Sequence, residues 1–281
     1  MGEELKAELA TAIELANRAG ELLMSYRERD LEVSSKSVDR DLVTSADTAA
    51  EAIILDGIGA AFPDDGILAE ESGNSSNQAE QGRLWCVDPL DGTVNFVQGL
   101  PMFSVSIALL EEGVPVMGVV HLPVLSETFT ARLGDGCRLN GELVVTSAKA
   151  ELSTAVLATG FPYRRHLLAD NNLENFNRLF LKLRGIRRMG SAAIDLAYVA
   201  AGRIDAYWEL HLGAWDCAAG VILVREAGGI ADTIVPGGDC VHGANIIAGP
   251  AVLCEQMREH LLRGRGQDYP PLGDLPVEQA R

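Results

Sequence analysis

The sequence predicts an α+β fold, and three features of its hydrophobic pattern support this class. Two early segments, 3–27 and 46–60, repeat apolar residues with the spacing of an amphipathic helix. Two later segments, 103–110 and 114–122, have the composition of strands and are joined by a Glu-Glu-Gly turn, which is typical of an antiparallel hairpin. From about residue 149 onward, short predicted strands alternate with predicted helices. The first half therefore combines two helices with a largely antiparallel sheet, and the second half is mixed.

Length and composition favour one large domain. The 281 residues are 47% hydrophobic, which suffices for a sizeable core, and only 5% aromatic, so that this core is mainly aliphatic. No internal repeat and no separating linker divides the chain. We therefore expect a single domain over 1–263, made of two tightly packed halves at about 1–148 and 149–263. The segment 264–281 contains three prolines and is predicted to be a disordered tail.

Charge and cysteine content narrow the class of partner. The formal net charge is −17, which disfavours binding to nucleic-acid phosphates, so no direct nucleic-acid partner is expected. No apolar run approaches the ~20 residues that span a bilayer, and the acidic N-terminus does not resemble a signal peptide, so no membrane association is expected. The five cysteines are scattered and odd in number, which favours reduced thiols in a cytoplasmic protein.

The remaining elements of the first half follow from local signals. The polar segment 27–40 breaks the helical pattern and is predicted to form a mobile loop or a short hairpin. Ser45 is the predicted N-cap of helix 46–60, which places Asp47 in the first turn, where a carboxylate complements the helix dipole. Further strands are predicted at 67–69, 128–133 and 137–143, and an exposed loop is predicted at 73–81.

In the second half, glycines and short polar turns separate the predicted elements. Asp216 is the predicted N-cap of a helix that runs to residue 226. The other predicted helices are 168–183, 191–201 and 251–262, and the predicted strands are 154–160, 186–189, 204–210, 230–234 and 245–248.

The stretch 85–96 carries the clearest chemical signal. It begins as an apolar strand, and Pro89, which has no N–H, is expected to end that strand at Asp88. A sharp turn would let Asp88 and Asp91 converge, and two converging carboxylates repel each other unless a cation lies between them. Asp91 and the two residues after it can also open a helix, whose free N–H groups attract an anion. Taken alone, the same residues fit a common Asp-Gly turn followed by a helix cap.

The full string that begins at Asp88, Asp-Pro-Leu-Asp-Gly-Thr-Val-Asn-Phe, resembles at every position the signature of the inositol monophosphatase family of Mg²⁺-dependent, lithium-sensitive phosphatases. The run 215–229 is similar to the second signature of that family. Glu70 follows Ala69 in a segment that resembles the family's Gly-Glu-Glu. The resemblance covers about residues 5–262. It implies a layered αβαβα sandwich of the inositol monophosphatase and fructose-1,6-bisphosphatase type.

The resemblance also implies a metal site made of oxygen ligands from distant segments. The ligands that it implies for two to three Mg²⁺ ions are Glu70, Asp88, the backbone carbonyl of Leu90, Asp91 and Asp216. No His or Cys accompanies these acids, which favours Mg²⁺ over zinc or iron.

The implied reaction is the in-line attack of an activated water on a phosphate monoester, without a phospho-enzyme. Asp47 and Thr93 would orient and deprotonate the water, and a weaker ion near Glu70 would assist. The N–H groups of Gly92 and Thr93 would hold the phosphate at the start of a helix.

For the substrate, the resemblance implies inositol 1-phosphate. Glu209 and the turn Gly190-Ser191-Ala192 occupy the positions that touch the ring in inositol monophosphatases, and Asp91 would bind a ring hydroxyl. Two alternatives stay open: fructose 1,6-bisphosphate, and a broad range of sugar, polyol and nucleotide phosphates.

Three basic residues are weaker candidates for the substrate site. Arg164 and Arg165 would suit a second phosphate, and Lys36 lies in the polar segment 27–40. Solvation at the surface is the simpler explanation of all three.

The resemblance also bears on partners. Family members are usually homodimers, and the small-residue helix 191–201 is a candidate contact. The segment 190–229 and the Thr-Gly-Phe-Pro-Tyr turn at 159–163 are similar to the bacterial branch of the family, some members of which bind the transcription machinery. Binding to a protein of the transcription machinery is therefore a candidate additional role beside catalysis.

Overall fold

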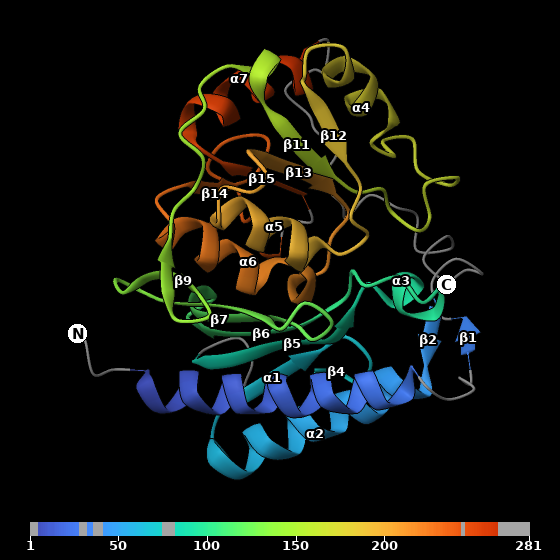
Figure 1. Ribbon diagram of the computed structural model, residues 1–281, viewed down its shortest axis with the longest axis vertical. Coiled ribbons are helices and arrows are strands. Elements are labelled where there is room, and N and C mark those ends of the chain that lie inside the picture. Colours follow the sequence, from blue (N-terminus) through green and yellow to red (C-terminus); the bar gives the residue numbers. More distant parts are fainter. Residues whose placement is uncertain (1–4, 28–32, 36–41, 75–81, 243–244, 264–281) are drawn as a thin grey trace.

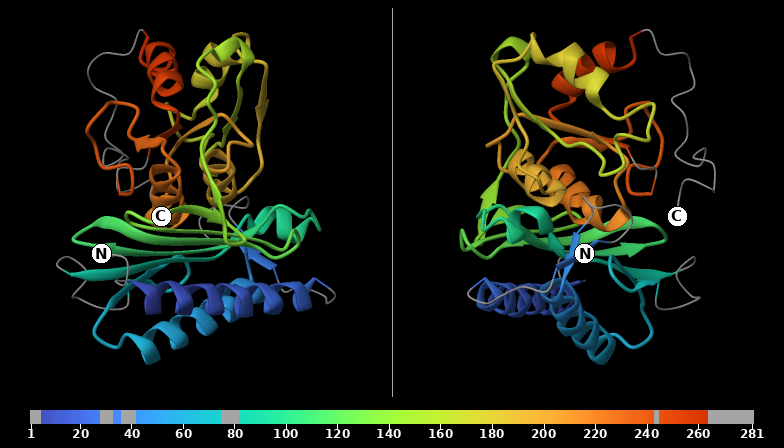
Figure 2. Two further views of the ribbon diagram at one scale, coloured as in Figure 1. Left: turned by 60° about the vertical axis from the view of Figure 1, so that its left-hand side comes forward. Right: turned by 90° about the vertical axis from the view of Figure 1, so that its right-hand side faces the viewer.

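The computed structural model describes residues 5–27, 33–35, 42–74, 82–242 and 245–263. These residues form five stacked layers in the order helix, sheet, helix, sheet, helix (Figures 1 and 2). The αβαβα arrangement is therefore confirmed. The candidate Lys36 and the predicted tail 264–281 lie outside the described residues.

Helices α1 (Lys6–Tyr26) and α2 (Ser45–Ala61) form the first layer and cover one face of an eight-stranded sheet (Figure 1). In spatial order its strands are β10 (Glu142–Val144), β9 (Gly136–Leu139), β8 (Glu127–Arg132), β7 (Val114–Leu122), β6 (Ser104–Glu111), β5 (Arg83–Asp91), β3 (Gly66–Ala69) and β4 (Gly73–Asn74). Every neighbouring pair is antiparallel except β3 and β5. The predicted combination of two helices with a largely antiparallel sheet is thus confirmed.

The upper layers come from the second half of the chain. Helices α5 (Ala192–Ala200) and α6 (Ala214–Glu226) lie between the large sheet and a five-stranded one. In spatial order the strands of the smaller sheet are β12 (Gly185–Arg187), β11 (Val156–Thr159), β13 (Ala206–Leu210), β15 (Asn245–Gly249) and β14 (Ile230–Asp232). Its outer face carries α4 (Leu173–Phe180) and α7 (Ala251–Leu261). Three short elements complete the fold: the antiparallel pair β1 (Val33–Ser35) and β2 (Leu42–Thr44), α3 (Thr93–Val97), and a 3₁₀ helix at Leu152–Thr154.

Strand β5 shows why the large sheet is buried on both faces. Its side chains alternate, so that Trp85 and Val87 pack in the cluster beneath α1 and α2, whereas Leu84 and Cys86 pack in the cluster around α5 and α6. A strand covered on both faces reads as a continuous apolar run, as this one does. The polar residues at its end are therefore held by a rigid, solvent-excluded support.

The end of β5 differs from the prediction. The strand does not stop at Asp88 but continues through Pro89 to Asp91, with a register shift against β6 between the two aspartates. A bulge of this kind accommodates a residue that cannot donate a ladder hydrogen bond, and it re-aims the neighbouring side chains. The predicted strand 137–143 is likewise divided, because Asn140 and Gly141 both adopt positive φ angles, 49° and 87°, and turn the chain between β9 and β10.

Two predicted helix caps are displaced. Thr44, and not Ser45, caps α2, with Asp47 completing a capping box. Helix α6 begins at Ala214 after the N-cap Gly213, so Asp216 is the third residue of the helix and accepts the Gly213 N–H from within the first turn. The prediction that Asp216 is the N-cap was therefore wrong, although its carboxylate does accept a hydrogen bond from a free backbone N–H at the start of the helix.

Helix α4 is shorter than the predicted 168–183. It starts at Leu173 because Asn172, at φ 73°, is in the left-handed region and directs its side chain into a buried hydrogen-bond network. Because the Asn172 side chain forms these tertiary hydrogen bonds, its backbone leaves the helical conformation, and the helix cannot extend to the residues before it.

The small-residue helix α5 is an interior element. All of its residues except Tyr198 are buried, so the prediction that this helix packs against a partner subunit was wrong.

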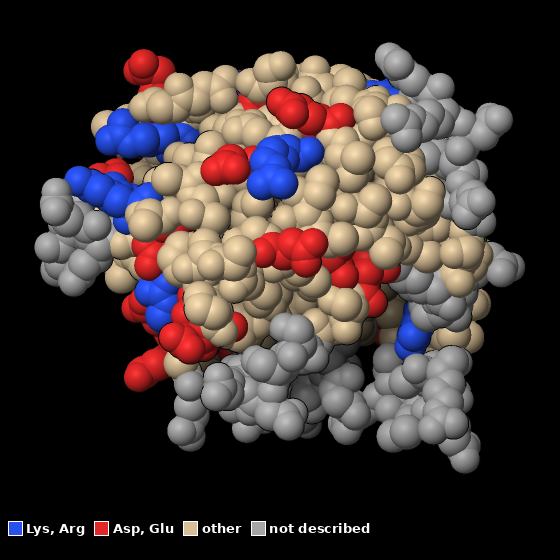
Figure 3. All heavy atoms as spheres, turned by 90° about the horizontal axis from the view of Figure 1, so that it is seen from below, with Lys and Arg blue, Asp and Glu red and all other residues tan. Residues whose placement is uncertain are grey.

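Among the described residues, no helix is both long and apolar enough to cross a membrane. Figure 3 views the molecule from the side of α1 and α2, where Lys and Arg lie interspersed with Asp and Glu. On α1, the exposed side chains of Arg18 and Glu14 form an ion pair at 3.5 Å.

Candidate active site

The segment 88–93, called the acidic loop below, lies where β5, α3 and the start of α5 meet. After Asp91, Gly92 adopts φ 99°, and a side chain there would place its Cβ 2.9 Å from the carbonyl oxygen of Met102. Both the backbone conformation and the close approach therefore require glycine. The chain then enters α3 at Thr93, as the sequence predicted.

Three aspartates are held by backbone N–H groups. The carboxylate of Asp88 accepts the Leu90 N–H at 2.9 Å, that of Asp91 accepts the Ala193 N–H at 2.7 Å, and that of Asp216 accepts the Gly213 N–H at 2.6 Å. The Ser191 hydroxyl also donates to Asp91 at 2.6 Å, so the start of α5 orients a residue 100 positions earlier. In each aspartate one oxygen is thus fixed by the fold, which is how ligating carboxylates are oriented.

Glu70 and the three aspartates form one electrostatic cluster. Burial raises the pKa of Asp88 well above its usual range, and the charges of Glu70, Asp91 and Asp216 raise it further. Burial likewise raises the pKa of Asp91 to about 7, against the opposing hydrogen bonds from Ser191 and Ala193, and it raises the pKa of Asp216. Glu70, at the end of β3, therefore lies close enough to act on the three aspartates of β5 and α6, and the charged forms of these aspartates are disfavoured.

The donor set of this cluster fits a hard divalent cation, because every side chain in it offers carboxylate oxygen and their charges are mutually repulsive. Within the described residues, however, no three His, Cys, Asp or Glu side chains are arranged closely enough to hold a metal ion as they stand.

A second constellation joins Asp47 of α2 to the loop. Its carboxylate accepts the Thr44 N–H at 2.9 Å and the Thr44 hydroxyl at 2.6 Å on one oxygen, and the Thr93 hydroxyl at 3.1 Å on the other. The Thr93 hydroxyl also lies 3.2 Å from the carbonyl oxygen of Leu90. Burial raises the pKa of Asp47 despite these hydrogen bonds. The structure therefore brings together two residues 46 positions apart, as the resemblance implied.

Glu209 of β13 lies at the far side of the site. It is buried, accepts the hydroxyl of Tyr207, and packs so tightly on Gly160 that a Cβ there would lie 2.0 Å from a carboxylate oxygen of Glu209. Burial raises the pKa of Glu209, and the charge of Arg188 opposes this rise. The sequence analysis missed both Tyr207 and Arg188, and also Asp195 of α5, whose Oδ1 is buried without a hydrogen-bond partner in the described structure.

The turn Gly190-Ser191-Ala192 is tied to the acidic loop. The side-chain amide of Asn95 donates to the carbonyl oxygens of Met102 at 2.6 Å and Met189 at 2.8 Å. Gly190 lies against this amide, since a Cβ at Gly190 would be 2.7 Å from Asn95 Nδ2. Asn95 therefore joins the two halves of the chain at the site.

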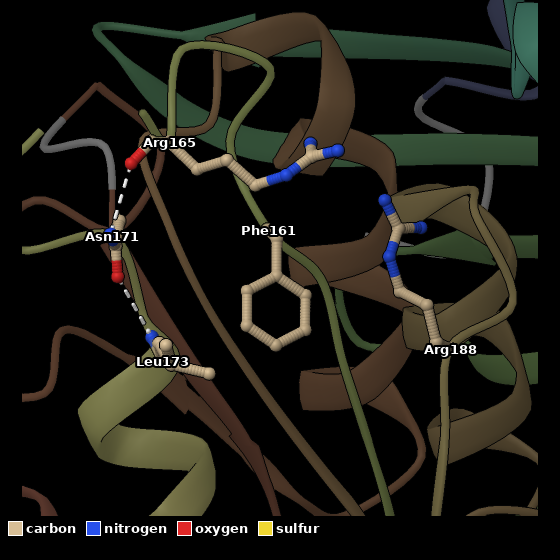
Figure 4. Close-up of a pocket in the computed structure, with 5 residues that line it drawn as sticks. All are labelled: Phe161, Arg165, Asn171, Leu173 and Arg188. Atoms are coloured by element: carbon tan, nitrogen blue, oxygen red, sulfur yellow. Dashed lines mark hydrogen bonds between the residues drawn. The ribbon is translucent and has the colours of Figure 1, made fainter. Parts of the chain in front are cut away.

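Of the two arginines proposed for a second phosphate, Arg165 lines a cavity that is also lined by Phe161 (Figure 4), and Arg164 is not among the residues that line this cavity. Arg188 lines the same cavity.

The layered fold and the acidic loop at the end of β5 together define a class, that of the layered αβαβα phosphatases. Comparison with known proteins agrees: the model of the inositol monophosphatase family matches residues 4–264, and the chain belongs to this family. The family assignment made from the sequence is thus confirmed.

Three relatives illustrate the similarity. The chain is 43% identical over 242 residues to the Nus factor SuhB of Escherichia coli K12, covering 86% of this chain and 90% of that protein. The crystal structure of the extragenic suppressor protein suhB from Bartonella henselae is 40% identical with a TM-score of 0.86, covering 92% of this chain and all of the other. The inositol monophosphatase from Anabaena sp. PCC 7120 is 39% identical with a TM-score of 0.83, covering 96% and 99%.

Proposed function

We propose that this protein is a Mg²⁺-dependent phosphomonoesterase that hydrolyses inositol 1-phosphate to inositol and phosphate. The observation that carries the proposal is the convergence of Asp88, Asp91 and Asp216, each fixed by a backbone N–H, beside the Asp47–Thr93 pair. Membership of a phosphatase family supports the reaction class.

Two to three Mg²⁺ ions would be held by oxygen ligands of this chain. The proposed ligands are Glu70, Asp88, the Leu90 carbonyl, Asp91 and Asp216. Bound there, the ions would neutralise the cluster, lower the pKa of the attacking water and stabilise charge on the leaving oxygen.

The residues of the chain position the reactants. The Thr93 hydroxyl donates a hydrogen bond to Asp47. The lone pairs of the Thr93 oxygen therefore face away from Asp47 and can accept a hydrogen bond from the attacking water. Asp47 then receives the proton that the water loses, for which its raised pKa is an advantage. The N–H groups of Gly92 and Thr93 hold the phosphate, and Glu70 assists at the water.

The ring of the substrate would lie between the acidic loop and β13. Asp91 and Glu209 accept hydrogen bonds from ring hydroxyls, and the turn Gly190-Ser191-Ala192 forms the wall beside them. Because Tyr207 and Gly160 fix the carboxylate of Glu209, its orientation is set before the substrate arrives.

Replacing Glu209 with Ala tests the choice of substrate. A hydrogen bond to a charged group contributes about 1.5–3 kcal/mol, so kcat/KM for inositol 1-phosphate should fall roughly tenfold to a hundredfold. The rate with p-nitrophenyl phosphate, which has no ring hydroxyls, should change by less than about twofold. Glu209→Gln, which can still accept the Tyr207 hydroxyl, is the matched control for side-chain size.

A substrate panel decides between inositol 1-phosphate and the alternatives. It contains inositol 1-phosphate, fructose 1,6-bisphosphate, adenosine 3′,5′-bisphosphate, histidinol phosphate and glycerol 2-phosphate. A lead of tenfold or more for fructose 1,6-bisphosphate over inositol 1-phosphate would refute the inositol assignment, and equal rates within a few-fold would indicate a broad-specificity phosphatase.

We also propose a second role as a binding partner of the transcription machinery, and a homodimer as the assembled form. The similarity to proteins named Nus factor SuhB supports the first of these. A pull-down from native extract, with Asp88→Asn as a bait deficient in catalysis, should recover transcription proteins with both baits. Recovery of none would remove this role without affecting the phosphatase assignment.

A further inference from the structure

Two buried serines of β6 lie directly opposite the aspartates of the acidic loop. In the antiparallel pairing of β5 with β6, Ser104 is the partner of Asp91 and Ser106 is the partner of Asp88. The two serines are only 0% and 1% exposed. A hydroxyl buried to this degree forms its hydrogen bonds within the protein. The partners of these two hydroxyls therefore show how β6 is connected to the rest of the site.

The Ser104 hydroxyl reaches the start of α5. Its Oγ lies 3.3 Å from the Oγ of Ser191, a residue 87 positions later in the chain. Within the described part of the chain, the Ser104 hydroxyl has no other hydrogen-bond partner. The Ser106 hydroxyl instead donates to the carbonyl oxygen of Trp215, at 3.4 Å. The two serines share a strand and a substitution pattern, but only Ser104 is hydrogen-bonded to Ser191.

The direction of the bond between Ser104 and Ser191 follows from the hydrogen-bonding capacity of Ser191. A hydroxyl has one proton to donate and two lone pairs that accept. The Ser191 proton goes to Oδ2 of Asp91, at 2.6 Å, because the charged form of Asp91 has no proton to donate. One lone pair of Ser191 accepts the Ile194 N–H, at 3.2 Å, and so caps α5. The second lone pair is left for Ser104, which is therefore the donor.

This chain of hydrogen bonds determines which oxygen of Asp91 is available to a ligand. Oδ2 of Asp91 accepts both the Ser191 hydroxyl and the Ala193 N–H, at 2.6 Å and 2.7 Å. Among the described residues, Oδ1 of Asp91 accepts no hydrogen bond, so it is the oxygen that a cation can use. A donor to the Ser191 oxygen fixes the position of that hydroxyl, and it strengthens by polarisation the bond that Ser191 donates in turn.

We propose that Ser104 is a positioning residue for Asp91: its hydroxyl acts through Ser191 and holds the carboxylate with Oδ1 toward the metal site. The inference rests on the proposed function in one respect, that Asp91 is a metal ligand. Because Ser104 belongs to the first half of the chain and Ser191 to the second, the same bond also holds the two halves in register beside the site.

A double-mutant cycle on metal affinity tests the proposal without substrate. The probe is Mn²⁺, and the free ion is counted by electron paramagnetic resonance. Ser191→Ala should raise the free Mn²⁺ concentration at half-saturation roughly tenfold or more, as expected for the direct partner of a ligand. Ser104→Ala should raise it about threefold to tenfold, the factor for one neutral hydrogen bond. In a protein that already carries Ser191→Ala, adding Ser104→Ala should change it by less than about twofold, because the path to Asp91 is gone.

Ser106→Ala is the matched control. It removes an equally buried hydroxyl two residues along the same strand, and its hydrogen bond goes to Trp215. Its effect on Mn²⁺ binding should therefore be the same with and without Ser191→Ala. Ser104→Cys, whose thiol is a weaker donor, should lie between the wild type and Ser104→Ala, which gives a graded result that does not depend on the Ser191 variant.

The outcomes separate this inference from the proposed function. Wild-type Mn²⁺ binding in Ser104→Ala, or equal losses from Ser104→Ala with and without Ser191→Ala, would overturn the positioning role and leave the phosphomonoesterase assignment standing. If the cycle gives the expected values but none of the phosphates in the substrate panel is hydrolysed, the proposed function fails and the positioning of Asp91 by Ser104 stands.

Discussion

Replacing Asp88 with Asn is expected to lower kcat by at least about a thousandfold, because the change removes a charge at the centre of the proposed metal site. Glu70, Asp91 and Asp216 all act on Asp88 electrostatically, so Asp88 is coupled to every other carboxylate among the proposed ligands. The amide oxygen of Asn can still accept the Leu90 N–H that orients Asp88. Geometry is thereby kept while the negative charge is lost.

The stability of the variant provides the internal control. Removing one of several buried, mutually repelling carboxylates should leave the metal-free protein at least as stable as the wild type in thermal unfolding. Asp56→Asn, at an exposed position on α2, should retain full activity. Phosphate release is measured over a Mg²⁺ series and in excess chelator. Full wild-type activity in chelator, or an active Asp88→Asn, would contradict the metal-dependent mechanism.

The local part of the site could be predicted from the sequence because it is contiguous. Asp88, Asp91 and Thr93 lie within six residues, and the strand, turn and helix that place them are short-range features. Glu70, Asp47 and Asp216 are remote in the chain, and only the resemblance to a family placed them in the same site. Whether these residues bind metal stays a prediction.

The part that could not be predicted depends on tertiary contacts. Arg188 looks like any exposed arginine after a strand, and its significance appears only when the parallel pairing of β11 with β12 places it near Phe161. Asn172 ends α4 early because its side chain finds Thr159, Gly160 and Trp208, none of which is near it in sequence. Pro89 remains within β5 because the bulge against β6 leaves it at a position where no N–H has to be donated to the neighbouring strand. The low strand propensity of proline alone predicts the opposite.

Replacing Thr93 with Val is expected to lower kcat by roughly a hundredfold to ten-thousandfold, the usual range for loss of a general acid–base relay. Valine has nearly the same shape, so the position of α3 should be kept. The hydroxyl that links Asp47 to the proposed water position is lost, however, and one oxygen of the buried Asp47 carboxylate loses its donor. Thr93→Ser, which restores a hydroxyl at the same position, should recover most of the rate.

A second pair of variants distinguishes this relay from simple support of the fold. Asp47 both caps α2 and accepts the Thr93 hydroxyl, so Asp47→Asn alone cannot separate the two roles. Thr44→Val removes only the capping side and should cost about 0.5–2 kcal/mol of stability while kcat falls far less than in Thr93→Val. If Thr44→Val and Thr93→Val instead lose stability and activity in the same proportion, Asp47 acts by holding the fold, and the proton relay through Thr93 must be abandoned.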